Sequence, residues 1–189
     1  LLSYDLTVYR ANLRNEFQTL CVNGGTVCTG WGQAETRNVP KTIHQGVELG
    51  VSGLFDRHWE ARGIFLYSDF RFDGDATYGN NRLPGFPPVI LRGELLYRWG
   101  AGAGAAGKPA AYAGPTFEWV PTTAPMDNTN SVSNDAYALI GFKAGAPLDA
   151  SWSWFFDARN LADRKYAATT NIGAGWGGLL LWAAEHYGV

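Results

Sequence analysis

The chain has 189 residues, of which 46% are hydrophobic and only 17% are charged, and its formal net charge is −2. Charged residues make up roughly 25% of a typical soluble domain, and a small negative charge argues against a nucleic-acid-binding protein. The aromatic share of 14% and the 24 glycines suit a membrane β-barrel or a secreted β-sandwich. No stretch approaches the about 18 consecutive apolar residues that a transmembrane helix needs.

Alternating apolar and polar residues predict about eight strands, because a strand places successive side chains on opposite faces. The expected strands, in chain order, cover residues 2–12, 42–52, 59–68, 89–99, 111–119, 138–144, 152–159 and 179–189. The fourth alternates most clearly, with Val89, Leu91, Leu95, Tyr97 and Trp99 on one parity and Arg92, Glu94 and Arg98 on the other. We expect the apolar rows of the fourth and seventh strands to share one face of a sheet, opposite Arg92.

The connections between these strands alternate between long and short. The long ones are 17–37, 73–88, 121–135 and 161–178, and the short ones are 53–57, 100–109 and 147–150. A transmembrane barrel has long extracellular loops and short periplasmic turns, whereas a sandwich has no reason to gather its long loops at one end. The sequence therefore predicts an all-β fold, an antiparallel transmembrane β-barrel portion.

The seventh strand ends in a recognisable motif. Trp152, Trp154 and Phe156 alternate with polar residues, and the chain then reads Asn160-Leu161-x-Asp163-x-x-Tyr166. This arrangement near the end of the sequence resembles the closing segment of TonB-dependent outer-membrane receptors. A second stretch, 38–49, resembles the strand of that family that contains G-[VL]-E-[LA], here Gly46-Val47-Glu48-Leu49. With the strand rhythm between them, the resemblance covers nearly the whole chain.

The resemblance implies that residues 1–189 are the C-terminal part of a receptor barrel of about 22 strands, with the plug domain and the N-terminal strands absent. Because the first residues already read as the inside of a strand, we expect a fragment. The implied function is uptake of a scarce nutrient, most often a ferric siderophore, across the Gram-negative outer membrane. The implied partners are outer-membrane lipid, this ligand, and TonB acting through the absent plug. No cofactor is implied.

Two cysteines, Cys21 and Cys28, lie in the first long loop. We predict a disulfide, because oxidising compartments favour one; two free thiols are the alternative. The three histidines, His44, His58 and His186, are scattered, so no metal site is predicted. No nucleophile motif is present, and an enzyme is not expected.

Two sets of polar and aromatic residues are candidates for contacts. On the predicted inward faces lie His44, Glu48, Arg92, Glu94, Arg98 and Glu118, which the resemblance assigns to the lumen and to the plug. Solvation of a polar face is the simpler interpretation of the same pattern. In the loops lie Trp31, Tyr78, Asn80, Asn81 and Arg82, expected to be exposed groups of the kind that hold ligands.

Two other functions fit the sequence. One is a complete small eight-stranded barrel that acts as an adhesin or a structural protein, and the other is a secreted carbohydrate-binding β-sandwich. Strands taken from a wider barrel do not close on themselves with the same curvature. The receptor interpretation therefore predicts an open, curved sheet with strands 2–12 and 179–189 at its edges.

Overall fold

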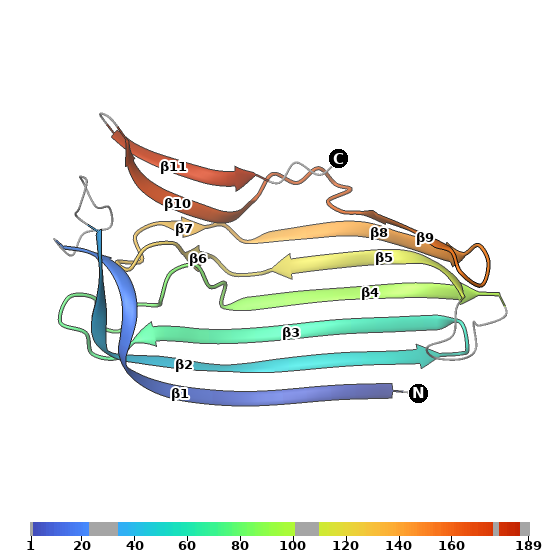
Figure 1. The fold of residues 1–189 in the computed structure, drawn as a ribbon, viewed down its shortest axis with the longest axis horizontal. Coiled ribbons are helices and arrows are strands. Elements are labelled where there is room, and N and C mark those ends of the chain that lie inside the picture. The colour runs from blue at the N-terminus through green and yellow to red at the C-terminus, as the bar shows by residue number, and fades with distance from the viewer. Residues whose placement is uncertain (1, 23–33, 101–109, 176–177, 186–189) are drawn as a thin grey trace.

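A computed structural model describes residues 2–22, 34–100, 110–175 and 178–185 (Figure 1). For residues 171–175 and 178–185 it describes the backbone alone. All regular elements in these ranges are strands: β1 (Leu2–Cys21), β2 (Ala34–Phe55), β3 (Trp59–Phe72), β4 (Val89–Trp99), β5 (Ala111–Val120), β6 (Ala124–Pro125), β7 (Ser133–Asn134), β8 (Tyr137–Pro147), β9 (Ser153–Ala158), β10 (Ala167–Gly175) and β11 (Gly178–Glu185). None of the described segments is a helix long and apolar enough to cross a membrane.

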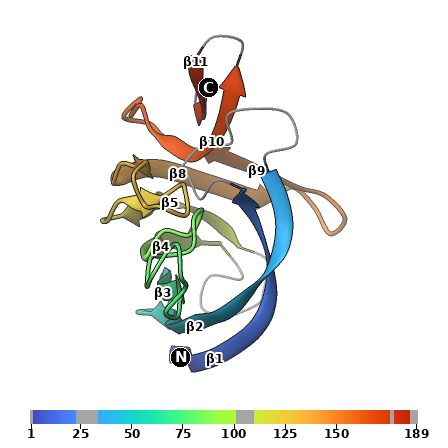
Figure 2. The ribbon, with the colours of Figure 1, turned by 90° about the vertical axis from the view of Figure 1, so that its left-hand side faces the viewer.

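Seven strands form one antiparallel sheet in the order β1-β2-β3-β4-β5-β8-β9. Figure 2 shows this sheet end-on as an open arc. The expected open, curved sheet with its first strand at one edge is therefore confirmed. The expected second edge is wrong: in the described part it is β9, because β11 pairs with β10 in a separate two-stranded sheet.

Directly opposed residues on neighbouring strands share a face of the sheet. We call one face the outer face, and it is apolar across the sheet. One of its rows runs Leu6, Leu49, Phe65, Leu91, Trp119 and Ala138, and the next runs Tyr4, Val51, Gly63, Gly93, Phe117 and Ile140. Leu6 is 58% exposed and Ile140 57%. An apolar surface of this extent left uncovered is typical of a face that meets lipid.

The opposite face, the inner face, carries the charges. Arg92 pairs with Ile64 and Glu118, and Glu94 pairs with Arg62 and Thr116. The prediction that the apolar rows of the fourth and seventh strands oppose Arg92, Glu94 and Arg98 is confirmed by this register. The connections also sort as predicted: Figure 1 places the β3–β4 and β5–β8 connections at one end, the loop end, and the β2–β3 and β8–β9 turns at the other, the turn end.

The first hairpin is longer than predicted: within the loop expected at 17–37, residues 17–21 and 34–37 are strand. The two faces of this hairpin exchange at Asn15, which has a φ of 57° and whose opposite residue, Pro40, drops out of the ladder. By simple alternation Glu16 belongs with Arg14 on the outer face, yet it bonds to Thr42 and His44 on the inner face. A left-handed residue within a strand turns the following side chain over, so no single period of two describes β1.

Beyond this reversal, the last described part of the hairpin, residues 16–21 of β1 and 34–39 of β2, folds across the loop end, as Figures 1 and 2 show. We call this part the hairpin tip. Its apolar side closes a small core with loop 73–88, made of Leu20, Val39, Phe72, Tyr78 and Leu83, each at most 3% exposed. This core therefore lies at the loop end, between the ends of β1, β2 and β3 and loop 73–88.

The loop predicted at 161–178 is also wrong, because the chain does not reverse after β9. It continues along β8 in one direction: Ala158 pairs with Phe142, the Leu161 amide donates to the Ile140 carbonyl, and the Tyr166 ring lies 4.6 Å from that of Tyr137. Thr170 then bonds to Asn134. The strand β10 thus extends the path of β9, and the reversal falls between β10 and β11.

Asn160 explains why this interruption is compact. Its φ is 54° and that of Asp163 is 48°, so both residues are left-handed, as asparagine and aspartate tolerate. The Asn160 Oδ1 accepts a hydrogen bond from the Arg164 amide at 2.8 Å, and its Nδ2 donates to the Arg164 carbonyl at 3.1 Å. The asparagine of the motif therefore closes a tight turn within a continuing strand path.

Candidate functional site

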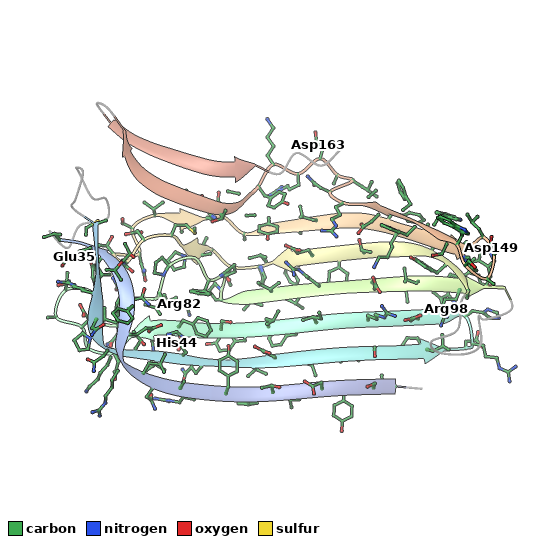
Figure 3. All side chains as sticks on the ribbon, viewed as in Figure 1. Glu35, His44, Arg82, Arg98, Asp149 and Asp163 are labelled. Carbon is green, nitrogen blue, oxygen red and sulfur yellow. The ribbon has the colours of Figure 1, made fainter. Side chains whose placement is uncertain are left out.

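A network of ion pairs crosses the inner face from β3 to β8. Its contacts are Arg98–Glu60 at 3.3 Å, Arg62–Glu60 at 2.5 Å, Arg62–Glu94 at 3.4 Å, Lys143–Glu94 at 2.8 Å and Arg92–Glu118 at 2.7 Å. A hollow of about 470 Å³ opens beside it, and its charged lining includes Arg62, Arg92, Glu118 and Asp157. Figure 3 shows Arg98 at the turn end. The wall thus presents alternating charges to whatever fills the concave side.

The contact between Lys143 and Glu94 spans a whole strand. Lys143 lies on β8 and Glu94 on β4, with β5 between them. The residue directly opposite Lys143 on β5 is Gly114, which has no side chain to obstruct the lysine. Both charged side chains are partly shielded, with 32% and 14% of their surfaces exposed. This pair is therefore less screened by water than an ordinary surface pair.

We expect a double-mutant cycle of Glu94→Gln and Lys143→Met to give a coupling energy of about 1–2 kcal/mol, because the two residues are in contact and partly desolvated. The cycle is measured by urea unfolding, in detergent, of the full-length polypeptide, by which we mean the complete protein that contains these 189 residues. Arg159 and Asp157 are the matched control: they also form an ion pair, at 3.1 Å, but Arg159 is 82% exposed. Their coupling should stay within about 0.5 kcal/mol, and equal couplings for the two pairs would contradict the expectation.

A second cluster lies on the inner face near the loop end. Glu16 accepts hydrogen bonds from the Thr42 hydroxyl and from His44 Nε2, the latter at 3.2 Å. The His44 ring stacks on Phe70 at 4.6 Å, and Phe86 meets Phe70 edge-on at 5.0 Å. A histidine, a carboxylate and exposed aromatic surface therefore meet just below the loops. The sequence did not single out Glu16, because the reversal at Asn15 hides its face.

The loops 73–88 and 121–136 are joined to each other. Asn130 Oδ1 accepts from the Arg82 amide at 2.8 Å, and its Nδ2 donates to the Arg82 carbonyl at 2.9 Å. Asn81 Nδ2 donates to the Asn128 carbonyl at 2.9 Å, and the Gly85 amide donates to the Pro125 carbonyl at 2.8 Å. The two loops therefore form one connected surface at the loop end.

Asp127 organises the second of these loops. Its carboxylate accepts hydrogen bonds from the amides of Thr129 and Val132, at 3.0 and 2.7 Å, and from the hydroxyls of Thr129 and Ser131. Burial alone would raise the pKa of Asp127, but these hydrogen bonds outweigh it and hold the pKa below its ordinary value of 3.8. The ionised form is therefore the one that this loop stabilises.

Because the pKa of Asp127 is lowered on folding, its stabilising effect is complete above the ordinary value and is lost as pH falls through the lowered one. We expect Asp127→Asn to lower the free energy of unfolding by about 1 kcal/mol at neutral pH. The difference between the variant and the wild type should shrink as the pH falls below that ordinary value of 3.8. Thermal unfolding of both proteins across this range measures it. A difference that grows toward acid pH would oppose the prediction.

The structure corrects one expectation about the candidate loop residues. Tyr78 was expected to be exposed, but it is 3% exposed and stacks on Phe72 at 5.1 Å, because the tip of the first hairpin covers it. This burial raises the pKa of its hydroxyl. Asn80 accepts from the Gly74 amide at 3.0 Å, and Asn81 and Arg82 join the two loops as described. Trp31 lies outside the described residues. A role of this set in holding a ligand stays a prediction.

The register places His44, Glu48, Arg92, Glu94, Arg98 and Glu118 on the inner face. The structure brings Arg92 to Glu118 and Glu94 to Lys143, whereas Glu48 lies exposed between Thr7 and Leu66. Contact of this set with a plug stays a prediction. Lys143 was missed, although its position between Phe142 and Ala144 on an alternating strand was a readable signal. In the described ranges, no group of three or more His, Cys, Asp and Glu residues could hold a metal ion.

Cys21 takes part in a disulfide, and the described part of the chain contains no free cysteine. Cys28 lies outside the described residues, so its role as the partner stays a prediction. We expect a thiol-reactive maleimide to leave both cysteines unlabelled in the denatured, non-reduced protein and to label both after reduction. Mass spectrometry distinguishes these states, and double labelling before reduction would contradict the pairing.

Comparison with known proteins agrees with this geometry. A family model described as "TonB dependent receptor-like, beta-barrel" matches residues 1–161. The chain belongs to the TonB-dependent receptor β-barrel family. No curated protein sequence matches the chain.

Solved structures of two uptake or siderophore receptors and of a copper transporter resemble the fold at low sequence identity. The ferric yersiniabactin uptake receptor FyuA from Yersinia pestis superposes with a TM-score of 0.71 at 15% identity, over 99% of this chain and 26% of the receptor. The copper transporter OprC superposes with a TM-score of 0.72 at 16% identity, over 99% of this chain and 27% of the transporter. The siderophore receptor PiuA from Acinetobacter baumannii superposes with a TM-score of 0.64 at 16% identity, over 99% of this chain and 24% of the receptor. The chain thus spans about a quarter of the length of these structures.

Proposed function

We propose that this chain forms the C-terminal part of the barrel wall of a TonB-dependent receptor in a Gram-negative outer membrane. The receptor takes up a scarce nutrient, and a ferric siderophore is the ligand class that we expect. The observation that carries the proposal is the division of one curved sheet into an apolar outer face and a charged inner face. In a barrel of this family, the first face meets lipid and the second lines the lumen.

The two other functions receive less support from the fold. A complete small barrel needs the first and last strands to pair, but within the described ranges β1 pairs with β2 and β11 with β10. A sandwich needs a second sheet packed on the apolar face. In the described part that face is open, with Phe117 50% and Leu6 58% exposed. Both facts favour part of a wider barrel.

The ligand class rests on the similar structures. The names of FyuA and PiuA refer to a ferric siderophore and to a siderophore, and that of OprC refers to copper. We assign uptake of the ligand to the whole receptor, since this chain spans about a quarter of the length of the similar structures and energy from TonB would arrive through a plug domain. The inner-face ion pairs are the surface that we expect the plug to contact.

Uptake of radioactive iron tests this proposal. The complete receptor that contains this chain is produced in a Gram-negative strain that lacks its own siderophore receptors. The cells are supplied with purified ferric siderophores of the catecholate, hydroxamate and phenolate classes. We expect saturable uptake of at least one class that disappears when tonB is deleted. Uptake that persists without TonB, or association of the polypeptide with the soluble fraction, would refute the proposal. Uptake of copper but not of iron would support the proposal of a TonB-dependent receptor and would refute the proposal that its ligand is a ferric siderophore.

A further inference from the structure

Five basic residues gather on the outer face at the loop end of β1, β2 and β3. We call them the outer basic patch, and they are Arg10, Arg14, Lys41, Arg71 and Arg82. The register makes them neighbours: Arg14 pairs with Lys41, Ile43 with Arg71, and Arg71 with Arg82 through an isolated bridge. Figure 3 shows Arg82 at this end of the sheet.

The patch borders the apolar part of the outer face directly. The apolar row Val8, Val47, Tyr67 and Val89 runs across β1 to β4. Two residues further along β1 comes Arg10, which pairs with Gln45, and Gln45 pairs with Asp69. Arg14 lies four residues beyond Arg10 on the same face of β1, and it pairs with Lys41. The polarity of the outer face therefore changes within one or two residues, from aliphatic to basic.

The charges of the patch are not balanced. Asp69 forms an ion pair with Arg71 at 3.5 Å, and Asp73 lies beside Lys41, whose carbonyl accepts its amide at 3.1 Å. Five cations thus face two carboxylates. No ion pair among the described residues involves Arg10, Arg14 or Lys41, and all three are exposed.

The cations at the centre of the inner face, in contrast, are paired with carboxylates. Arg62, Arg92, Arg98 and Lys143 each have a carboxylate partner within 3.4 Å. Within the ranges that the structure describes, the absence of carboxylate partners at Arg10, Arg14 and Lys41 therefore distinguishes the outer face from the inner face. Arg10 donates a hydrogen bond to the Asn12 side chain at 3.4 Å, which leaves its charge uncompensated. Cations without a carboxylate partner suit an anion supplied from outside.

We propose that the outer basic patch binds the phosphate groups of an anionic lipid in the outer leaflet of the membrane. The aliphatic row directly below the patch offers contact for acyl chains, so a lipid satisfies both surfaces at once. A free phosphate ion would use only the cations. The assignment of the patch to the outer leaflet rests on the proposed function, in which the loop end faces outward.

Native mass spectrometry of the detergent-solubilised full-length polypeptide tests the proposal, with phosphatidylglycerol and phosphatidylcholine as probes. We expect the wild type to retain phosphatidylglycerol in preference to phosphatidylcholine. The variant Arg10→Gln/Arg14→Gln/Lys41→Gln should weaken phosphatidylglycerol binding about tenfold or more, because each exposed basic residue near an anionic headgroup adds a severalfold factor. High salt should weaken the preference of the wild type.

The matched control, Arg57→Gln/Arg164→Gln/Lys165→Gln, removes three exposed cations outside the patch and should leave lipid binding unchanged. Equal loss in both variants, or none in the first, overturns the proposal, as does full competition by inorganic phosphate. The pair Arg14→Gln/Lys41→Gln serves as a milder variant if the first is poorly folded. The iron uptake assay reports separately on the receptor function, which we expect the patch variant to keep.

Discussion

Ile140→Arg is expected to destabilise the membrane-embedded protein by about 2–4 kcal/mol, because an arginine at the middle of the lipid-facing band must be removed from water. Ile140 lies on the outer face, directly opposite Phe117, and is 57% exposed in the open sheet. The row that contains Ile140 crosses from β1 to β8, and the neighbouring outer-face residues of β8, Ala138 and Phe142, are also apolar. Its side chain therefore has no nearby polar region to reach.

The neighbouring residue provides the matched control. Leu139 lies on the inner face, opposite Glu118, so Leu139→Arg places the same charge beside a carboxylate. We expect this variant to change the free energy of unfolding by no more than about 1 kcal/mol. Urea unfolding of the full-length polypeptide in phospholipid vesicles, followed by tryptophan fluorescence, compares the two. If both arginines cost the same, the assignment of the faces to lipid and lumen is wrong.

Gly114→Ala is expected to destabilise the barrel by about 3 kcal/mol or to prevent folding, since overpacking against backbone has no flexible side chain to yield. An added Cβ at Gly114 would lie 1.9 Å from the Leu95 carbonyl oxygen and 2.9 Å from the Leu96 Cα. These are atoms of the neighbouring strand β4, so relief requires β4 and β5 to separate. The same substitution would also crowd the route of Lys143 to Glu94.

Gly50→Ala serves as the control for this prediction. Gly50 is also a strand glycine on the inner face, and an added Cβ there meets nothing within 4 Å. Alanine in place of glycine restricts the unfolded chain, so this variant should be as stable as the wild type or about 0.5 kcal/mol more stable. Unfolding midpoints in urea and heat-dependent electrophoretic mobility measure both variants. A tolerated alanine at 114 would show that the two strands lie further apart than described.

The faces of the sheet could be predicted from the sequence because alternation is a repeated signal. Val89, Leu91, Leu95, Tyr97 and Trp99 repeat the same parity along β4, so one exception would not change the assignment. The inner-face positions of Arg92, Glu94 and Arg98 follow from the same signal. The glycines and prolines of 73–88 and the polar residues of 121–135 likewise indicated these two connections.

What could not be predicted depends on single backbone angles. The left-handed conformation of Asn15 exchanges the faces of the first hairpin and brings Glu16 to His44, yet an asparagine in a polar stretch reads as a loop residue. Asn160 and Asp163 in the same way turn the chain without reversing it, so a motif between two strands was taken for a long loop. The burial of Tyr78 was missed for the same reason as Glu16, because the end of the first hairpin, which covers Tyr78, was expected to be a loop.

The unbroken path through β9 and β10 decides on which side of the membrane the described chain enters and leaves. Counted as one traverse, β9 and β10 bring the number of traverses to an even value, since β1 to β5, β8 and β11 each add one. The first residues of β1 and the last of β11 therefore point to the turn end of the wall. Had the motif at Asn160 been a reversal, the count would be odd and the two would face opposite compartments. Reporter peptides fused before β1 and after β11 would consequently share one compartment, which under the proposed function is the periplasm.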